Sequence, residues 1–507
     1  MSFSIKSDCV VALFLAILTL GICALKMTES FRMVDDSAAY VSQAIALTQG
    51  TTSEFIAENL AMIGKYDLEY MTPTTYPWGF PLLLAPIYKI FGFNIVAFKS
   101  VGVICYALFV GIFYIFCAIR LPRIYALFAT LFFAINPYMT NFSANEIYSD
   151  IPFMLFGFIT LIILAKLFDK SKSKNGIAIA TFGGIFMLFS TMIRINGFVI
   201  LCALIAMQSI LLAKRFAPKI FTTRILKPLS RIDSPYSWKI HAIPYAIFIV
   251  GFAIVSITLS SGTGRHLDYL AEISPQTILR NLSLMKFSLF MPLNTDIDSL
   301  LLWLCVPFIL LGIYANFRES SAKSIETIFY IIFVVGFFAL LLLWIDFEVR
   351  FLFLTLPFFV LWCAKGFTLI GKKLFRLSLA MLMVVILLNL VWINARDISF
   401  IKSSDISQED AYSAESKQLY KFIINNTPKN AIIISFKPRI LYLNTHRLSF
   451  VSPNIKRLNE ADFVLWNGKY TSVFDKRSMQ DIFSPEFQRK TQLIFQNAEY
   501  KLFKVLK

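Results

Sequence analysis

Charged residues are scarce in this chain of 507 residues. Asp, Glu, Lys and Arg make up 16% of the sequence, whereas a soluble domain carries about a quarter. Hydrophobic residues account for 57%, and several apolar runs reach or approach the ~20 residues that cross a bilayer. These features exclude a soluble enzyme and a disordered chain. They predict a polytopic α-helical membrane protein.

Histidine and paired cysteine are also lacking. The chain has 3 His and 7 Cys, and every cysteine falls in an apolar stretch, outside any Cys-x-x-Cys pair. Cysteine in such surroundings behaves as a small hydrophobic residue, which argues against a disulfide framework or a thiolate zinc site. The net charge of +17 comes from basic residues between the apolar runs. We interpret them as topology signals and contacts to anionic lipid head groups, not as a nucleic-acid surface.

About 11 apolar segments are predicted to span the membrane. They cover, approximately, residues 9–25, 94–119, 124–140, 151–168, 176–193, 197–213, 240–260, 300–316, 327–345, 351–370 and 377–393. The first is predicted to be a retained signal anchor because no small-residue cleavage site follows it. Loops rich in Lys and Arg alternate with poorer ones, so the positive-inside rule places the N-terminus in the cytoplasm and residues 396–507 outside.

Two parts of the chain are too polar to span a membrane. Residues 26–93 form a long external loop, in which we expect two surface helices, Asp36 to Leu47 closed by Gly50, and Ser53 to Ile63. Residues 396–507 are predicted to be a small α/β domain. Its expected elements are a helix at 414–425 and strands near 431–435, 463–466 and 499–505. We therefore divide the chain into a membrane domain, 1–395, and an extracytoplasmic domain, 396–507.

Acidic residues beside a membrane are costly and need an explanation. Asp35 and Asp36 follow the first span, and Asp36 stands four residues before Tyr40, so on a helix these two share a face. A helix N-cap accounts for one carboxylate only. Two adjacent carboxylates therefore leave both a structural and a functional interpretation open.

Three further polar segments fall on the same predicted external side. One carries Glu146 and Asp150, of which Asp150 either caps the next span or is a functional acid. Another contains Arg194, and a short turn contains Glu348 and Arg350, which form a local ion pair or a substrate contact. Arginine binds phosphate oxygens, and a carboxylate can accept a proton from an attacking hydroxyl. An outward-facing site of this composition suits chemistry on a lipid-linked phosphate.

These motifs resemble the polyprenyl-phosphate-sugar-dependent membrane glycosyltransferases of the GT-C class, which include the protein O-mannosyltransferases and the lipid A aminoarabinose transferases. The similarity rests on the Asp36–Tyr40 spacing, the Pro-rich segment 76–86, the Asn-Pro…Asp-Ile-Pro segment 136–152, and Arg350-Phe351 ahead of a proline. The Pro-rich segment is expected to break helical structure in a re-entrant turn. Residues 75–78 lack the Glu-Lys-Pro-Pro element of the aminoarabinose transferases, so lipid A is not assigned as the acceptor.

The resemblance implies a GT-C-like fold and transfer of a sugar from a polyprenyl-phosphate donor to an envelope lipid, glycan or protein. It implies a periplasmic site in a bacterial inner membrane. Asp36 would be the general base or orient the acceptor hydroxyl in an inverting displacement, with Asp35 as the alternative and Asp150 in support. The other residues expected to bind substrate are Tyr40, Arg194, Glu348 and Arg350. Some relatives use a divalent metal ion, for which Asp36 and Asp150 are the candidate ligands.

Two other functions are consistent with a protein of this class. A transporter or flippase of lipid-linked sugars predicts charges midway across the spans and an inverted repeat, and the sequence shows neither. A scaffold for envelope assembly would act through the C-terminal domain. There Lys437, Arg439 and Arg447 form either a solvated basic face or a contact for an anionic acceptor.

Overall fold

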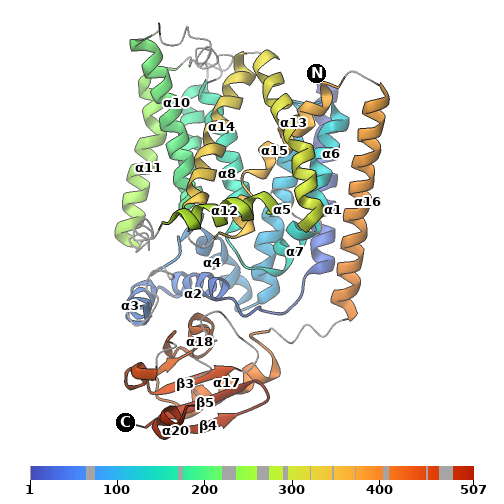
Figure 1. Cartoon of the computed structure of the whole chain (residues 1–507). Helices are drawn as coiled ribbons and strands as arrows, with labels where there is room; N and C mark the ends of the chain where they lie inside the picture. The colour runs from blue at the N-terminus through green and yellow to red at the C-terminus, as the bar shows by residue number, and fades with distance from the viewer. Residues whose placement is uncertain are drawn as a thin grey trace.

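The computed structural model describes most of the chain. The described residues are 2–63, 75–168, 175–217, 219, 234, 236–259, 273–288, 295–319, 321–344, 347–370, 373–403, 410–452, 455–467 and 484–506. Figure 1 shows a bundle of long helices with the C-terminal domain at one end and the N-terminus at the other.

Most of the described helices form the bundle. They are α1 (Ser2–Lys26), α5 (Ile95–Ala118), α6 (Arg123–Ala134), α7 (Pro137–Asn145), α8 (Asp150–Ala165), α9 (Gly176–Ile193), α10 (Phe198–Phe216), α11 (Trp238–Thr258), α13 (Thr295–Glu319), α14 (Ser321–Leu342), α15 (Leu356–Thr368) and α16 (Lys373–Ser403). The other helices of the membrane domain are α2 (Asp35–Gln49), α3 (Thr52–Ile63), α4 (Gly79–Phe91), α12 (Pro275–Ser288), η2 (Lys166–Phe168), η4 (Ile195–Gly197) and η9 (Val349–Leu352). Of these, α2, α3 and α4 lie at the end of the bundle that faces the C-terminal domain (Figure 1).

The prediction of a polytopic helical membrane protein is confirmed. Within the described residues, eight helices are long and apolar enough to cross a membrane, and three more apolar helices are shorter. One predicted span, 124–140, is wrong as a single helix, since α6 ends at Ala134 and α7 begins at Pro137. Proline lacks the N–H that would continue α6, and the Asn136 side chain instead caps α7 by accepting a hydrogen bond from the Met139 N–H at 3.0 Å.

The Pro-rich segment forms a helix where we expected a re-entrant turn. Helix α4 begins at Gly79, which places Pro81 in its first turn, where a backbone N–H has no helical partner to lose. Gly79 packs directly on the backbone of Met192 and Ile193, and a Cβ there would lie 2.5 Å from the Ile193 nitrogen. Glycine therefore allows α4 to approach the end of α9 closely.

Helix α2 matches the prediction, and its ends are informative. It closes at Gly50, which adopts a left-handed conformation with φ 75°. Its N-cap is Val34, with no side-chain capping bond. The interpretation of Asp35 or Asp36 as the N-cap of this helix is therefore wrong, and both carboxylates have other contacts.

The C-terminal domain contains a five-stranded mixed sheet among its described residues, in the order β2-β1-β3-β5-β4. The strands are β1 (Ile432–Ile434), β2 (Leu448–Phe450), β3 (Phe463–Asn467), β4 (Thr491–Gln496) and β5 (Tyr500–Val505), and the helices are α17 (Ala414–Asn426), α18 (Pro438–Thr445), η11 (Ile455–Glu460) and α20 (Pro485–Lys490). β1 pairs in parallel with β2 and β3, while β5 pairs antiparallel with β3 and β4. Helix α16 continues to Ser403, past residue 396, where we propose that the domain begins.

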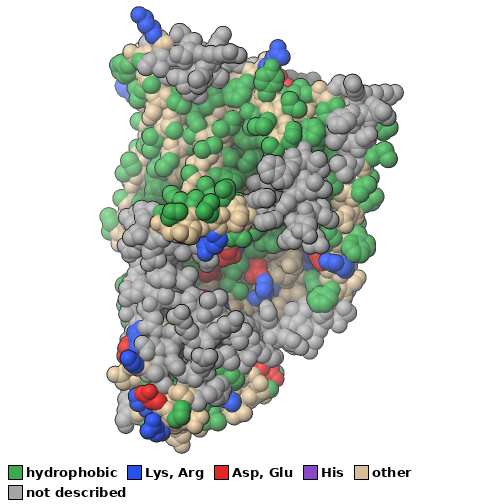
Figure 2. Space-filling model, in the orientation of Figure 1, with side chains coloured by type: hydrophobic (Ala, Val, Ile, Leu, Met, Phe, Trp, Pro, Cys, Tyr) green, Lys and Arg blue, Asp and Glu red, His purple; other side chains and the backbone are tan. Residues whose placement is uncertain are grey.

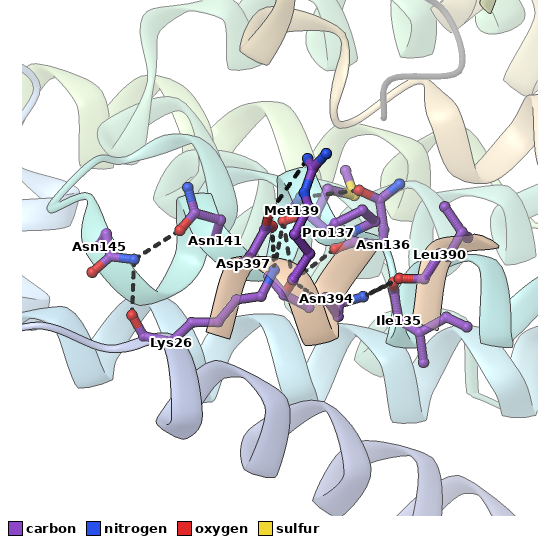
Figure 3. Close-up of polar contacts among 12 residues, drawn as sticks. Lys26, Ile135, Asn136, Pro137, Met139, Asn141, Asn145, Leu390, Asn394 and Asp397 are labelled. Atoms are coloured by element: carbon purple, nitrogen blue, oxygen red, sulfur yellow. Dashed lines mark hydrogen bonds and ion pairs between the residues drawn. The ribbon is translucent and has the colours of Figure 1, made fainter. Parts of the chain in front are cut away.

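Helix α16 is fastened to the bundle by a small set of buried polar contacts (Figure 3). Lys26 Nζ, at the end of α1, lies 3.1 Å from Asp397 Oδ2 and 3.3 Å from the Pro137 carbonyl oxygen. The Asn394 amide donates to the Ile135 carbonyl at 2.7 Å. Because only 11% of the apolar part of α16 is buried, these contacts carry much of its attachment. We call Lys26, Asn394 and Asp397 the α16 latch.

We expect the two halves of the latch ion pair to respond unequally to substitution. The Lys26 side chain is fully buried, whereas the Asp397 side chain is 29% exposed. Asp397→Leu leaves a buried cation without its partner, which costs about 3–5 kcal/mol of stability. Lys26→Met fills the same space with apolar atoms and leaves a carboxylate that water can reach, so its cost is smaller. Unfolding in mixed micelles measures the difference.

Arg396→Gln is the comparison, because Arg396 lies on the same helix, is 64% exposed and reaches Asp397 Oδ1 only at 3.9 Å. An exposed ion pair of this kind contributes about 0–1 kcal/mol, so the stability should stay within that range of the parent protein. Equal losses for Asp397→Leu and Lys26→Met would contradict the explanation based on burial.

Candidate active site

Charged side chains gather at one level of the molecule. Figure 2 shows hydrophobic side chains over most of the described bundle surface, and Lys, Arg, Asp and Glu side chains in a hollow beneath α12, between the bundle and the C-terminal domain. The polar segments that the sequence analysis singled out meet at this end of the bundle.

Asp36 lies in the first turn of α2 and contacts two other segments. The Tyr76 hydroxyl donates a hydrogen bond to its Oδ1 at 2.6 Å, and Nη2 of Arg350 lies 3.3 Å from its Oδ2. Burial raises the pKa of this carboxyl group, but the Arg350 charge, the Tyr76 hydrogen bond and the Arg439 charge outweigh it and hold the pKa below its ordinary value of 3.8. Asp36 is therefore an anion at neutral pH, with 28% of its side chain exposed.

Arg350 is the centre of the site. It lies in η9, between α14 and α15, and its side chain is only 8% exposed. Its Nε lies 2.7 Å from Glu348 Oε2, and its Nη1 lies 3.6 Å from Asp150 Oδ2. The guanidinium also stacks over the Tyr148 ring at 4.1 Å. The local ion pair expected in this turn is present, but Arg350 also joins the turn to α2 and α8.

Asp150 lies in the first turn of α8, and its side chain is 2% exposed. Its Oδ1 lies 2.5 Å from Nη1 of Arg194, which precedes η4. The N-cap of α8 is Ser149, so the interpretation of Asp150 as that cap is wrong, although an acid in the first turn still favours the helix dipole. Carboxylates and guanidinium groups thus alternate in the order Asp36, Arg350, Asp150 and Arg194.

Tyr40 lies one turn along α2 from Asp36, as the spacing predicted. Its hydroxyl group is 2.9 Å from the Ser149 hydroxyl oxygen, and its ring centroid is 4.8 Å from that of Tyr76. Burial is the main cause that raises the pKa of Tyr40 to about 12. The phenol is therefore neutral and ties α2 to the start of α8.

Asp35 faces a different part of the molecule from Asp36. Burial raises the pKa of the Asp35 carboxyl group, and this is partly offset by the charges of Lys437 and Arg439 and by a hydrogen bond from the Ile440 backbone N–H. All three residues belong to the start of α18 in the C-terminal domain. The two adjacent aspartates are thus separated in space, one toward the membrane domain and one toward the C-terminal domain.

Of the three basic residues singled out in the C-terminal domain, Arg439 and Arg447 do not belong to a solvated face, whereas Lys437 is half-buried. Arg439 is 5% exposed and lies over the Tyr76 ring at 4.8 Å. Arg447 is also 5% exposed, and its guanidinium donates to Thr427 and to backbone carbonyls within the domain. The prediction of an exposed basic patch is therefore wrong for both, because each guanidinium has partners that only the folded chain brings near.

The fold brings together the six site residues predicted from the sequence: Asp36, Tyr40, Asp150, Arg194, Glu348 and Arg350. Tyr76, Tyr148 and Arg439 also lie at this site and were not predicted as parts of it. Tyr76 and Tyr148 lie inside the motifs that carried the resemblance, so their aromatic character was an available signal. Arg439 lies 403 positions beyond Asp36, and no local pattern links the two.

The charged groups do not form a metal site of the usual kind. No group of three or more His, Cys, Asp or Glu side chains that could hold a metal ion occurs among the residues that the structure describes. The carboxylates of Asp36 and Asp150 already share the Arg350 guanidinium. This donor set does not fit a resident divalent ion, so we derive no step through one.

The comparison with protein families agrees with this geometry. Residues 75–227, which include α4 to α10 with Asp150 and Arg194, match the family described as dolichyl-phosphate-mannose-protein mannosyltransferase. The match covers this segment only, over which the chain is similar to that family. Direct comparison of the sequence with curated proteins gives no match.

Solved structures of membrane enzymes show the same fold as this chain. ArnT from Cupriavidus metallidurans in the apo state superposes with a TM-score of 0.59 at 8% identity, over 97% of both chains. ArnT bound to undecaprenyl phosphate gives 0.55 at 10% identity, again over 97% of both. The oligosaccharyltransferase AglB from Archaeoglobus fulgidus, in complex with an inhibitory peptide and a dolichol-phosphate, gives 0.55 at 12% identity, over 91% of this chain and 69% of AglB.

Proposed function

We propose that this glycosyltransferase moves a sugar from a polyprenyl-phosphate carrier to an acceptor at the end of the bundle where α2 meets the C-terminal domain. The observation that carries the proposal is the alternation of Asp36, Arg350, Asp150 and Arg194, which combines a low-pKa carboxylate with one buried and one half-buried guanidinium group. Structures with the same fold hold dolichol-phosphate or undecaprenyl phosphate. We place the site on the periplasmic face of a bacterial inner membrane.

The reaction is an inverting displacement at the anomeric carbon. The acceptor hydroxyl oxygen forms a bond to that carbon, and the bond from the carbon to the carrier phosphate breaks. Asp36 accepts the hydroxyl proton late in the reaction, when the attacking oxygen has become acidic, so a base of low pKa suffices. The carrier phosphate leaves as a stable anion, so a second carboxyl group is not needed as an acid.

The two arginines bind and stabilise that phosphate. Arginine presents a planar set of donors to phosphate oxygens. These donors stabilise negative charge more strongly in a site that excludes water than in bulk water. Glu348 is the carboxylate that releases Arg350 when the carrier phosphate binds, because the Glu348 side chain is 48% exposed while that of Asp150 is buried. Asp150 stays in place and holds Arg350 and Arg194 at a fixed separation. Tyr40 lines the pocket between them.

The acceptor is an envelope lipid, a glycan or a protein, and the site chemistry requires only a nucleophilic hydroxyl or amine. Membrane lipids surround the bundle, and no surface for nucleic acid is part of the proposal.

Carrier-dependent turnover tests the proposal. The purified full-length protein in lipid nanodiscs is incubated with radiolabelled sugars on undecaprenyl phosphate, one sugar at a time. The release of undecaprenyl phosphate is then followed, because it reports both transfer to an acceptor and hydrolysis. We expect release with one sugar and none with the same sugar on a nucleotide diphosphate.

A parallel assay in sealed liposomes separates the enzyme from a flippase. If the labelled lipid crosses the bilayer in a protein-dependent manner and no donor is turned over, the enzymatic proposal fails. A third outcome is that neither turnover nor lipid crossing occurs, while deletion of the C-terminal domain disrupts envelope assembly. In that case the enzymatic proposal also fails, and the protein is an assembly scaffold.

A further inference from the structure

The C-terminal domain is docked onto the surface helices of the membrane domain. Tyr442 of α18 donates a hydrogen bond to Glu58 of α3 and packs against Phe55, with ring centroids 6.1 Å apart. Tyr442 and Phe55 belong to a small apolar cluster that also contains Ala46 and Trp78. Apolar packing therefore already accounts for the attachment of α18.

A second attachment joins the domain to the segment between α1 and α2. The Phe31 N–H donates to Asp410 Oδ1 at 2.8 Å, and the Ala411 N–H donates to the Phe31 carbonyl at 2.7 Å. Docking thus has two independent anchors, neither of which involves Arg439.

A buried arginine at this interface therefore requires its own explanation. Burying a guanidinium group is expensive, and attachment alone does not need one. Arg439 lies over the ring of Tyr76, and the hydroxyl of that same tyrosine donates the 2.6 Å hydrogen bond to Asp36. Asp35, the neighbour of Asp36, accepts a hydrogen bond from the backbone N–H of Ile440, which follows Arg439 in the chain. The start of α18 thus contacts two neighbours of Asp36, namely its hydrogen-bond partner Tyr76 and the preceding residue Asp35.

We propose that the C-terminal domain completes the active site through Arg439. Arg439 is a positioning residue that fixes the Tyr76 ring, and the Tyr76 hydroxyl in turn fixes the Asp36 carboxylate. Asp35 is one further contact of α18, beside the apolar cluster. The inference rests on the proposed role of Asp36 as the base, and it gives the C-terminal domain a part in the reaction.

The charge of Arg439 also acts on Asp36 directly. Arg439 is one of the groups that hold the pKa of Asp36 down, together with Arg350 and Tyr76. The other titratable groups that face Asp36 are Asp35 and Tyr40 from α2, Tyr148 ahead of α8, and Glu348 beside η9. Loss of the Arg439 cation therefore raises the pKa of Asp36, so the protonated, inactive form persists to higher pH.

Three variants of the full-length protein test the proposal. Arg439→Gln removes the cation and its stacking, and Arg439→Lys keeps the charge. Arg457→Gln is the matched control, since Arg457 of the same domain also lies over an aromatic ring, that of Phe450, and pairs with Glu460. We expect Arg439→Gln to lower turnover of the undecaprenyl-phosphate sugar roughly 5- to 30-fold, the range for a buried cation–π contact. Arg457→Gln should retain parental turnover.

The dependence of turnover on pH distinguishes a positioning role from a structural one. In Arg439→Gln the acid limb of the kcat profile should move to higher pH. In Arg439→Lys, which keeps the charge, the limb should lie close to its position in the parent protein. A domain that is merely loosened would lower the whole profile and leave the limb in place. An unmoved limb, or equal losses in Arg439→Gln and Arg457→Gln, overturns the proposal.

Infrared titration of the Asp36 carboxyl band, assigned by its disappearance in Asp36→Asn, gives a readout that needs no turnover. A band midpoint that rises in Arg439→Gln, in a protein that turns over no donor, would sink the proposed function and leave the Arg439 inference standing. A midpoint equal to that of the parent protein would sink the Arg439 inference alone.

Discussion

Asp36→Asn should reduce sugar transfer by about 10²- to 10⁴-fold, the contribution of a general base to such reactions. The amide preserves the shape of the side chain and can still accept the Tyr76 hydrogen bond, but it has neither the negative charge nor the capacity to take a proton. Donor binding should change little, because Arg350 and Arg194 remain. The measurement is release of undecaprenyl phosphate under single-turnover conditions, alongside donor binding to the same preparation.

Asp35→Asn decides which of the two adjacent aspartates is the base. Asp35 contacts the start of α18 and, within the described part of the chain, forms no ion pair with Arg350 or Arg194, so its replacement should cost about tenfold or less, as expected for one interdomain hydrogen bond. If Asp35→Asn were the more damaging change, the assignment of Asp36 as the base would be reversed. Equal, complete losses would mean that docking and chemistry cannot be separated by substitution.

Arg350→Lys should be the second most damaging substitution, with a loss of about 10²- to 10³-fold in kcat, as for removal of a donor that stabilises developing negative charge. Lysine keeps one positive charge, so Asp36 and Asp150 are not left as an unpaired buried pair. It cannot reproduce the planar set of donors that reaches Glu348, Asp36 and Asp150 together.

The matched comparison for Arg350→Lys is Arg318→Lys. Arg318 lies in the last turn of α13 and stacks over Tyr314, and it is not part of the charged cluster. Turnover, donor affinity and thermal stability are measured for both. Parental turnover in Arg350→Lys would show that charge alone suffices, and the role of the guanidinium shape would be lost.

Much of this site could be predicted from local sequence because each residue carries its own signal. Asp36 and Tyr40 share a helical face by spacing, and Asp150 stands ahead of an apolar run at a boundary where acids are costly. Arg350 and Glu348 occupy a polar turn between two spans. The topology then placed these segments at the same end of the bundle, which is where the structure brings them together.

The remaining features depend on contacts between distant segments. Whether Asp36 caps its helix or binds Arg350 is decided by η9, more than 300 positions away. In the sequence, nothing distinguishes Arg439 from a solvent-exposed arginine. Its burial depends on the packing of α18 over Tyr76. Strands β2 and β4 were missed because three- and six-residue segments with mixed polarity leave no clear alternation, and pairing with β1 and β5 defines them.

The opposite orientations of Asp35 and Asp36 have a consequence for exchanging parts between related enzymes. A chimaera with the C-terminal domain of a related enzyme keeps its original α2. Its Asp35 then contacts an α18 from another protein, whose first residues differ from those that Asp35 contacts here. Such a protein would fold, insert and bind donor, yet turn over slowly. Grafting α2 and the segment before α4 along with the domain restores the match. The transferable module is therefore discontinuous in sequence.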